Sequence, residues 1–296
     1  MEEFRSYYGL PVLNAPTWKS REIAGYFFLG GLAGGSSLVA AVAQRTGRPS
    51  VVKGAKVAAA GAAAMSLAAL VKDLGRPSRA LNMLRVFKPT SPMSVGSWLL
   101  SAYAPAAMAA AASEMTGLLP GLGAVATTAA AALGPGVASY TAVLIADTAV
   151  PAWHDARREM PFVFVASAAT AAAGVGQLLC TDADATPLCR LAVGAVAGEL
   201  TAERLMEHRL DQTVAAAYHD GKAERLLQAS RAMAVLGAAT ALAGRRRRPL
   251  RVVSGAALLV SSVLTRFGIF DAGMTSANDP AATIAPQRAR LSARAG

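Results

Sequence analysis

The chain has 296 residues, of which 54% are hydrophobic and 16% are charged, and its formal net charge is +11. Soluble domains carry about 25% charged residues, so this composition excludes an ordinary soluble protein and favours a membrane protein. The positive charge is distributed among the segments between apolar runs. Its densest run, Arg245–Arg248, is expected to meet anionic lipid headgroups and not nucleic acid.

The first five apolar runs are predicted to cross the membrane as helices. They are Ile23–Gln44, Val57–Val71, Pro89–Ser113, Met115–Ala146 and Met160–Thr181. Four of them exceed the length of about 18–20 residues that a helix needs to span the hydrocarbon core. The second run is shorter, and three lysines near its ends are expected to reach the interface with their long side chains: Lys53, Lys56 and Lys72. The period-two alternation of barrel strands is absent, so the spans are helices.

Three further spans are predicted in the C-terminal half. Leu188–Met206 contains two glutamates. Ala232–Gly244 and Val252–Thr265 are short, so a re-entrant or interfacial hairpin is the alternative for this pair. Residues 1–21 are expected to form an interfacial segment, and the aperiodic residues 271–296 a disordered basic tail. The sequence thus predicts an all-α integral membrane protein with about eight transmembrane helices.

Eight spans place both termini on one side of the membrane. We call this side face A; it also carries the connectors 72–93, 147–161 and 204–231, and the opposite side is face B. Face A carries 19 of the 29 lysines and arginines, which weakly favours a cytoplasmic face A in the cell membrane. Cys180 and Cys189 flank one short connector on face B, where they form either a disulfide or two free thiols.

The sequence offers few ligands for a metal cofactor. His154, His208 and His219 all lie in connectors or at helix ends, so a haem held between two histidines is not expected. There is no cysteine quartet for an iron–sulfur cluster and no helical HExxH for zinc. If the protein takes part in redox chemistry, its carrier is therefore a diffusible organic molecule, and any metal belongs to a partner.

Acids and phenols recur at one membrane depth, near face A. Glu22 and Tyr26 lie one helical turn apart in the first span, Tyr140 and Asp147 two turns apart in the fourth, and Asp73 ends the second. Such a set suits a quinone, because its carbonyls need hydrogen bonds and its reduction needs protons.

Each of these residues also has a purely structural explanation. Tyr26 and Tyr140 could be ordinary interfacial aromatics, which are common at the ends of spans. Asp73 could form an ion pair with Arg76 or with Lys72. The pattern alone leaves both alternatives open.

Two carboxylates interrupt the sixth span. Glu199 and Glu203 are four residues apart and therefore share a helix face. Glu199 lies about 13 Å beyond Arg190 at about 1.5 Å per residue, which places it near the middle of the membrane. It is either a proton-relay carboxylate or one half of a buried pair with an arginine.

Four segments, in this order, resemble the NrfD family of membrane subunits from polysulfide-reductase-type complexes. They are YYGLPVLNAPTW (7–18), YFFLGGLAGGSS (26–37), DLGRPSRALNMLRVFKPTSPMSVGSW (73–98) and YTAVLIADTAVPAW (140–153). The resemblance covers about Tyr7 to Phe164, and DLGRP and FKPTSPMS are its most specific marks. Beyond Phe164 only the number of helices resembles the family.

The resemblance implies a fold of two four-helix bundles, over residues 22–160 and 161–270. It also implies that the chain binds menaquinone or another quinone, with neither haem nor an iron–sulfur cluster of its own. The expected partner is an iron–sulfur subunit of the four-cluster ferredoxin type, docked on the face that holds the quinone. That subunit would connect the chain to a molybdopterin enzyme, such as a polysulfide or formate oxidoreductase.

The matched positions imply roles for individual residues. Tyr26 falls where the family places a polar quinone ligand, Tyr140 matches the family's quinone tyrosine, and Asp73 lies near an acidic, proton-handling position. With Glu199 as a second proton-handling residue, the expected quinone-binding set is Glu22, Tyr26, Asp73, Arg76, Tyr140 and Asp147.

The charged connector 73–93 is expected to be a lid over the quinone and a docking surface. Arg79, Arg85 and Lys88 would meet an acidic surface of the partner. Two other functions compete with this hypothesis: a membrane anchor without a redox role of its own, and a small-solute transporter, which Pro135 within the fourth span could suggest.

Overall fold

The computed structural model describes residues 13–14, 16–73 and 82–295, apart from the side chains of residues 73, 289, 290 and 292–295. Every regular element in this part of the chain is a helix. The long helices are α1 (Ser20–Arg45), α2 (Pro49–Asp73), α4 (Pro92–Thr116), α5 (Pro120–Ala146), α7 (Met160–Leu179), α8 (Ala185–Arg209), α10 (Gly221–Ala243) and α11 (Arg248–Asn278). The shorter ones are α6 (Pro151–Asp155), α9 (Gln212–Ala215), the 3-10 helix η1 (Ala216–Tyr218) and α12 (Pro280–Ala295).

Prolines and a glycine set several helix boundaries. Pro49, Pro92 and Pro120 stand at the start of α2, α4 and α5, where the missing N–H leaves no hydrogen bond unmade. Gly117 ends α4 with a left-handed φ of 72° that a side chain would disfavour. Pro49, Gly117 and Pro120 flank the two short turns on face B, and α1 packs on α2 and α4 on α5 as antiparallel pairs.

Seven of the described helices are long and apolar enough to cross a membrane, which makes the chain a multi-pass membrane protein. They include α10 and α11, whose 23 and 31 residues make both helices longer than the apolar runs predicted for the last two spans. Both helices extend beyond the predicted apolar runs, Ala232–Gly244 and Val252–Thr265, because they also include neighbouring charged residues. The predicted sixth span, Leu188–Met206, corresponds to α8, which contains several charged residues and is not among these seven helices.

The predicted disordered tail is also wrong for the residues that the structure describes. α11 continues to Asn278, and α12 follows it. The indole Nε1 of Trp153 donates to the carbonyl of Ile269 at 2.8 Å, and Ser276 Oγ accepts from the Ala152 backbone N–H at 3.2 Å. α12 in turn packs on α6 and α9. These contacts come from segments far away in the sequence, so no local pattern reveals them.

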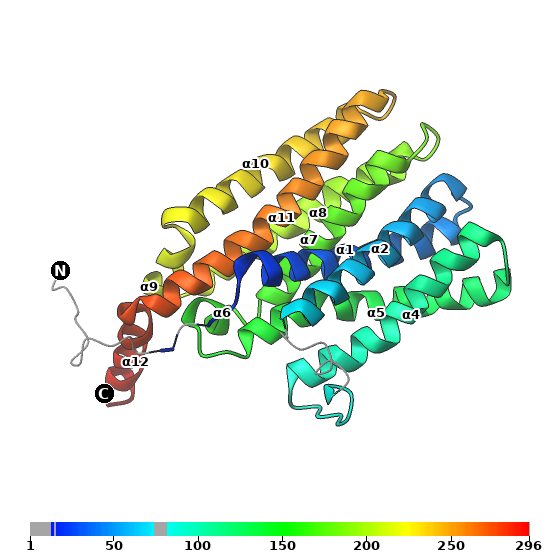
Figure 1. Cartoon of the computed structure of the whole chain (residues 1–296). Coiled ribbons are helices and arrows are strands. Elements are labelled where there is room, and N and C mark those ends of the chain that lie inside the picture. The colour runs from blue at the N-terminus through cyan, green and yellow to red at the C-terminus, as the bar shows by residue number, and fades with distance from the viewer. Residues whose placement is uncertain (1–12, 15, 74–81, 296) are drawn as a thin grey trace.

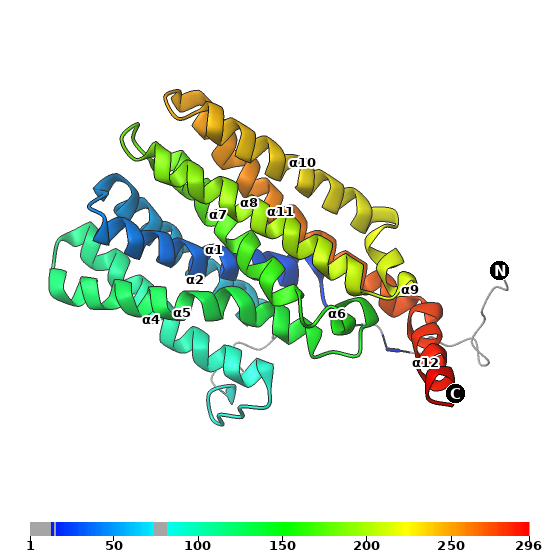
Figure 2. The same cartoon turned by 180° about the vertical axis from the view of Figure 1, so that it is seen from behind.

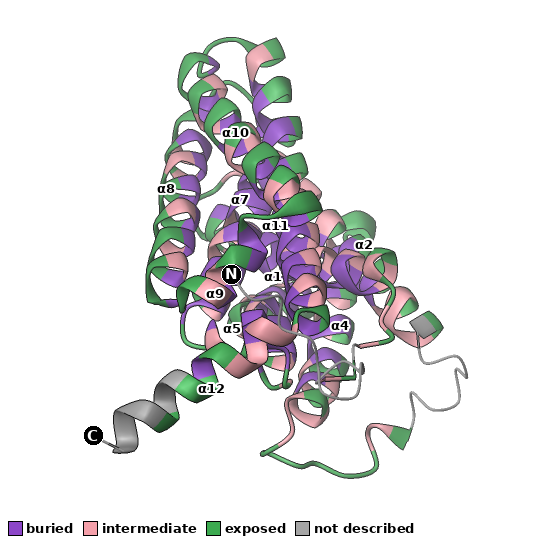
Figure 3. Ribbon diagram, turned by 90° about the vertical axis from the view of Figure 1, so that its left-hand side faces the viewer, coloured by how far each residue is buried: buried purple, intermediate pink, exposed green. Residues whose placement is uncertain are grey.

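The long helices lie side by side and alternate in direction (Figures 1 and 2). α6, α9 and α12 lie at the face-A end, and α1 is central because it packs against α2, α5, α7 and α11. Figure 3 shows buried residues gathered on α1, α7 and α11, with more exposed faces on α8 and α10. Large apolar side chains such as Met65, Leu122 and Val125 remain exposed, as expected of a surface that faces lipid.

Close backbone contact holds α1 against α5. A Cβ atom on Gly34 would lie 2.3 Å from the carbonyl oxygen of Gly134, and one on Gly134 would lie 2.6 Å from that of Gly34. Only glycine fits at both positions, as is typical of tightly packed membrane helices. This contact fixes how the face-A ends of α1 and α5 meet.

Candidate functional site

A pocket of about 90 Å³ lies among the face-A ends of α1, α2, α4 and α5. We call it the tyrosine pocket. Its lining consists of Trp18, Ile23, Tyr26, Phe27, Leu70, Met83, Met93, Ser97, Leu100, Tyr140 and Leu144. Two predicted ligands from different helices, Tyr26 and Tyr140, therefore meet in one pocket.

The two tyrosine rings lie edge to face within it. Their centroids are 6.3 Å apart at an interplanar angle of 75°, and the residues are 3% and 8% exposed. The Tyr140 hydroxyl is buried and has no hydrogen-bond partner among the described residues. A buried unpaired hydroxyl costs about 1–3 kcal/mol, so a hydrogen-bonding group of a ligand would stabilise this arrangement. Both tyrosines are buried, so an ordinary interfacial position does not describe them.

Gly96 of α4 leaves the space that the Tyr140 ring occupies. A Cβ atom at Gly96 would lie 2.3 Å from Cε2 of Tyr140, so any larger residue would displace the ring. The glycine was not singled out in the sequence because its role depends on a contact between α4 and α5. The local sequence indicates the role of Gly96 only by its place in the segment PMSVGSW, which also contains Met93 and Ser97 of the pocket.

An apolar groove of about 380 Å³ adjoins the tyrosine pocket and shares Leu70, Met83, Ser97 and Leu100 with it. We call it the lipid groove; its other lining residues are Leu67, Val71, Leu84, Ser101, Ala104, Pro105 and Met108. The hydroxyls of Ser97 and Ser101 donate to carbonyls of their own helix, so they offer little polarity to the groove. Together the two hollows form one mainly apolar space that holds the unpaired Tyr140 hydroxyl at its pocket end.

Other predicted ligands lie elsewhere. Glu22 forms an ion pair with Lys72 at 3.4 Å, which joins α1 to α2, and it is not among the residues that line the pocket. Asp147 is exposed at the end of α5. Arg76 and Arg79, together with the Asp73 side chain, fall outside the described residues.

The described part of the charged connector is exposed. Arg85 and Lys88 both face outward, as do Val86 and Phe87, which are 69% and 57% exposed. The ring of Phe87 packs edge to face on Trp98 with centroids 6.2 Å apart. Met83 of the same connector lines the tyrosine pocket, so the exposed surface and the pocket are adjacent.

Glu199 is far from this pocket in the fold, on α8. It is 1% exposed and accepts hydrogen bonds from Thr170 Oγ1 at 2.7 Å and Thr265 Oγ1 at 2.9 Å. Glu203, one turn away and 3% exposed, pairs with Arg231 Nε at 3.0 Å. Both predicted glutamates are thus buried among polar partners, but they do not line the tyrosine pocket or the lipid groove.

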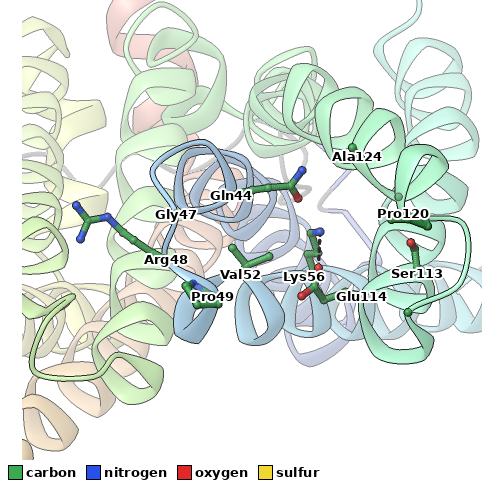
Figure 4. Close-up of a pocket in the computed structure, with 12 residues that line it drawn as sticks. Gln44, Gly47, Arg48, Pro49, Val52, Lys56, Ser113, Glu114, Pro120 and Ala124 are labelled. Carbon is green, nitrogen blue, oxygen red and sulfur yellow. Dashed lines mark hydrogen bonds and ion pairs between the residues drawn. The ribbon is translucent and has the colours of Figure 1, made fainter.

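A separate hollow of about 450 Å³ opens on face B (Figure 4). Its polar residues include Gln44, Arg48 and the ion pair between Lys56 Nζ and Glu114 Oε2, 2.8 Å apart. Lys56 is only 5% exposed, so the expectation that it reaches the interface is wrong. The ion pair with Glu114, on a different helix, keeps the ammonium group of Lys56 inside the fold.

Metal ligands do not gather in the described part of the chain. No group of three or more histidine, cysteine, aspartate or glutamate side chains there could hold a metal ion. Cys180 and Cys189 are both buried free thiols.

One comparison with known proteins places the chain in a family. The family model described as "Polysulphide reductase, NrfD" matches residues 14–184, which is more than half of the chain. The match includes Tyr26, Gly96 and Tyr140 and ends just before α8 begins. No curated protein sequence matches the chain.

Proposed function

Because the chain belongs to the NrfD family of membrane subunits from polysulfide-reductase-type complexes, we propose that it is the subunit that binds quinone or quinol in such a complex. In this role it exchanges electrons between the membrane quinone pool and a partner iron–sulfur subunit. The observation that carries the proposal is the buried, unpaired hydroxyl of Tyr140, in a pocket that continues into an apolar groove.

The two hollows match the two parts of a menaquinone-like molecule. A flat, aromatic headgroup suits the tyrosine pocket, where Tyr140 would donate a hydrogen bond to a carbonyl oxygen and Tyr26 would pack against the ring edge. An isoprenoid tail suits the lipid groove between α2 and α4. Phe27 and Leu100 close the pocket on the side of the helix core and exclude water from it.

Bound quinone would supply two-electron, two-proton redox chemistry. The chain's own residues would position the headgroup and handle its protons near face A. Asp73 follows Leu70 of the pocket by one helical turn, which supports its assignment as the residue that takes up or delivers a proton. Glu22, held by Lys72, and Asp147 are further acids at the same end of the helices.

The exposed connector beside the pocket supports a docking role. We assign Arg85 and Lys88, with Arg79 from the sequence, to an acidic surface of a four-cluster ferredoxin-type subunit. The exposed Val86 and Phe87 would add apolar contact area. Since Met83 of this connector lines the pocket, electrons would leave the headgroup beside the docked partner, which leads on to a molybdopterin enzyme.

We also propose that α8 crosses the membrane, so that eight helices form two groups of four. α8 packs on α7 and α10, and its two central carboxylates point inward and are buried. Charges that face the interior of a helical bundle are compatible with a span, because lipid does not contact them. Both termini then lie on face A.

The test compares two buried tyrosines in the purified complex. Tyr140→Phe removes the hydroxyl in the pocket, while Tyr103→Phe removes one that is hydrogen-bonded to Ser37 at 2.8 Å, outside the pocket. We expect quinol-linked electron transfer to fall about tenfold in the first variant, equivalent to about 1.4 kcal/mol, and to change little in the second.

Analysis of extracted lipid completes this test. The proposal predicts isoprenoid quinone in the wild-type complex and inhibition by headgroup analogues. A complex without quinone, but with its iron–sulfur partner, would indicate a simple anchor. Solute flux without any partner would indicate a transporter.

A further inference from the structure

A line of carboxylates runs along one face of α8. Glu199, Glu203 and Glu207 follow one another at intervals of four residues, which places them on the same side of the helix, about 6 Å apart along its axis. Glu199 lies near the middle of the helix, and Glu207 lies near its face-A end. The line therefore leads from the interior of the bundle toward one membrane surface.

Contacts join these groups to water at face A. Arg231 of α10 pairs with Glu203 through Nε at 3.0 Å and with Glu207 through Nη2. Glu207 Oε2 lies 3.6 Å from Nε2 of His219, whose side chain is 51% exposed. Exposure thus rises stepwise from the buried Glu199 and Glu203 through Glu207 to His219.

Hydroxyl groups surround the inner end of this line. Thr170 of α7 and Thr265 of α11 donate to the two oxygens of Glu199. Ser230 of α10 lies 2.7 Å from Thr265 Oγ1 and 3.2 Å from Ser261 Oγ. Hydroxyls both donate and accept hydrogen bonds and can rotate, so they can pass a proton and reorient around a carboxyl group.

Arg266 is a second, independent sign that the region around Glu199 holds charge in the interior of the bundle. It is completely buried, its Nη2 donates to the carbonyl of Phe164, and it lies close enough to Glu199 for their charges to interact. Its Nε and Nη1 have no hydrogen-bond partner among the described residues. Buried guanidinium N–H groups require acceptors, which internal water can supply.

Among the groups that contact this line of carboxylates, the charges do not balance with every group in its ordinary state. Three carboxylates face the two arginines Arg231 and Arg266; the other titratable groups beside them are His219 and Tyr218. A low-dielectric interior disfavours an unpaired charge, so one proton on the carboxylates or on His219 restores neutrality. A proton that can be held at any of several joined sites can also move among them.

The line ends in the middle of the bundle. Toward face B, α7 and α11 touch through their backbones, since a Cβ atom on Gly174 would lie 2.8 Å from the carbonyl oxygen of Gly255. Leu258 and Ala173 are fully buried beside this contact. This close packing separates Glu199 from face B along the seam between α7 and α11.

We propose that Glu199, Glu203 and Glu207, with Arg231 and His219, form a proton path from face A to a proton-holding site at Glu199 beside Arg266. The path lies in residues 199–266, beyond the part of the chain that matches the family model. It carries one proton inward or outward and needs no other reactant.

Aromatic contacts connect this site with the tyrosine pocket. The Arg266 guanidinium lies over the Phe164 ring, 3.8 Å from its centroid, and Phe164 packs on Phe27 of the pocket with centroids 5.9 Å apart. A change of charge or position at the headgroup would thus act on Arg266 and on the proton at Glu199. This coupling rests on the proposed quinone function, whereas the path itself does not.

Infrared spectroscopy of the complex in detergent tests the path without any quinone reaction. We expect a pH-dependent C=O stretching band from a protonated carboxyl group in an apolar setting, lost or shifted in Glu199→Gln and Glu203→Gln. Glu114→Gln is the matched control, because Glu114 is an ion-paired carboxylate on another helix near face B. A band that survives both α8 variants, or no such band in the wild type, would overturn the proposal.

Proton uptake, followed with a pH-sensitive dye after rapid quinone reduction, tests the coupling. Glu203→Gln should slow uptake at least tenfold and leave the initial electron transfer nearly unchanged. Glu207→Gln, at the more exposed end, gives the same test should the buried variants fail to assemble. Loss of the infrared band with unchanged uptake would retain the path and reject the coupling, while absence of bound quinone would reject the proposed function alone.

Discussion

The four long helices around the tyrosine pocket and the four around Glu199 hold polar side chains in different ways. Around the tyrosine pocket, α1, α2, α4 and α5 leave the hydroxyl of Tyr140 unpaired beside an open apolar groove. Between α7, α8, α10 and α11, carboxylates, arginines and hydroxyls are buried and joined by hydrogen bonds and ion pairs, while Nε and Nη1 of Arg266 have no partner among the described residues. The first arrangement suits an exchangeable lipid-soluble ligand, and the second suits a resident charge or proton.

The difference follows from which side chains reach the centre of each group. The first group packs mainly through small residues, and its buried ion pair, Lys56 with Glu114, lies near face B. The second group places Glu199 and Arg266 in its middle. Charges in that position need fixed partners from several helices, which leaves less freedom for an open pocket.

The largest expected effect comes from breaking the charge network of the second group. Arg266→Met removes a buried guanidinium and leaves Glu199 with less compensation, which should destabilise the protein by about 3–5 kcal/mol. The midpoint of thermal unfolding of the complex measures it. The double variant Arg266→Met with Glu199→Leu should recover much of the lost stability. Wild-type stability of Arg266→Met alone would contradict the importance of this network.

A smaller effect is expected in the first group, from a single methyl group. Gly96→Ala places a Cβ atom against the Tyr140 ring and should lower quinol-linked turnover about tenfold, the equivalent of about 1.4 kcal/mol. Gly61→Ala is the matched control, because a Cβ at Gly61 meets nothing within 4 Å. If both variants retain full turnover, the ring position is not important for the reaction.

The smallest effect is expected at the surface beside the pocket. Replacing Arg85 and Lys88 by alanine should weaken association with an acidic iron–sulfur partner severalfold at low salt and less at high salt, because exposed charges are screened. Binding kinetics at two ionic strengths measure it. The same pair of changes at Arg245 and Arg246, on face B, provides the control and should leave association unchanged.

Much of the helical pattern could be predicted from local sequence. Apolar runs predicted eight spans, and seven of the described helices are long and apolar enough to cross a membrane. The polar residues predicted at one depth included both tyrosines of the pocket. The limits of α10, α11 and the tail were missed because their charged or small residues are stabilised by distant partners. For example, the ring of Trp153 packs directly against Gly273 in the C-terminal part of α11.

Local sequence also could not separate the acids that line a site from those that do not. Glu22 and Tyr26 share a helix face, yet only Tyr26 lines the pocket, while Glu22 pairs with Lys72 of the next helix. The sequence predicts that Lys56 reaches the interface, but in the fold it pairs with Glu114 of another helix. In each case the decisive neighbour belongs to another helix.

The sequence by itself determined that the chain is a helical membrane protein of the NrfD type, because span length, apolar content and the four quoted segments are local properties. Only the tertiary structure decided that Tyr140 faces Tyr26 beside Gly96, and that Glu199 meets hydroxyls from α7 and α11. The physical reason is the close approach of the helices. Contacts such as Gly34 on Gly134 set each helix's rotation and depth, and a small change in either would turn these side chains toward different neighbours.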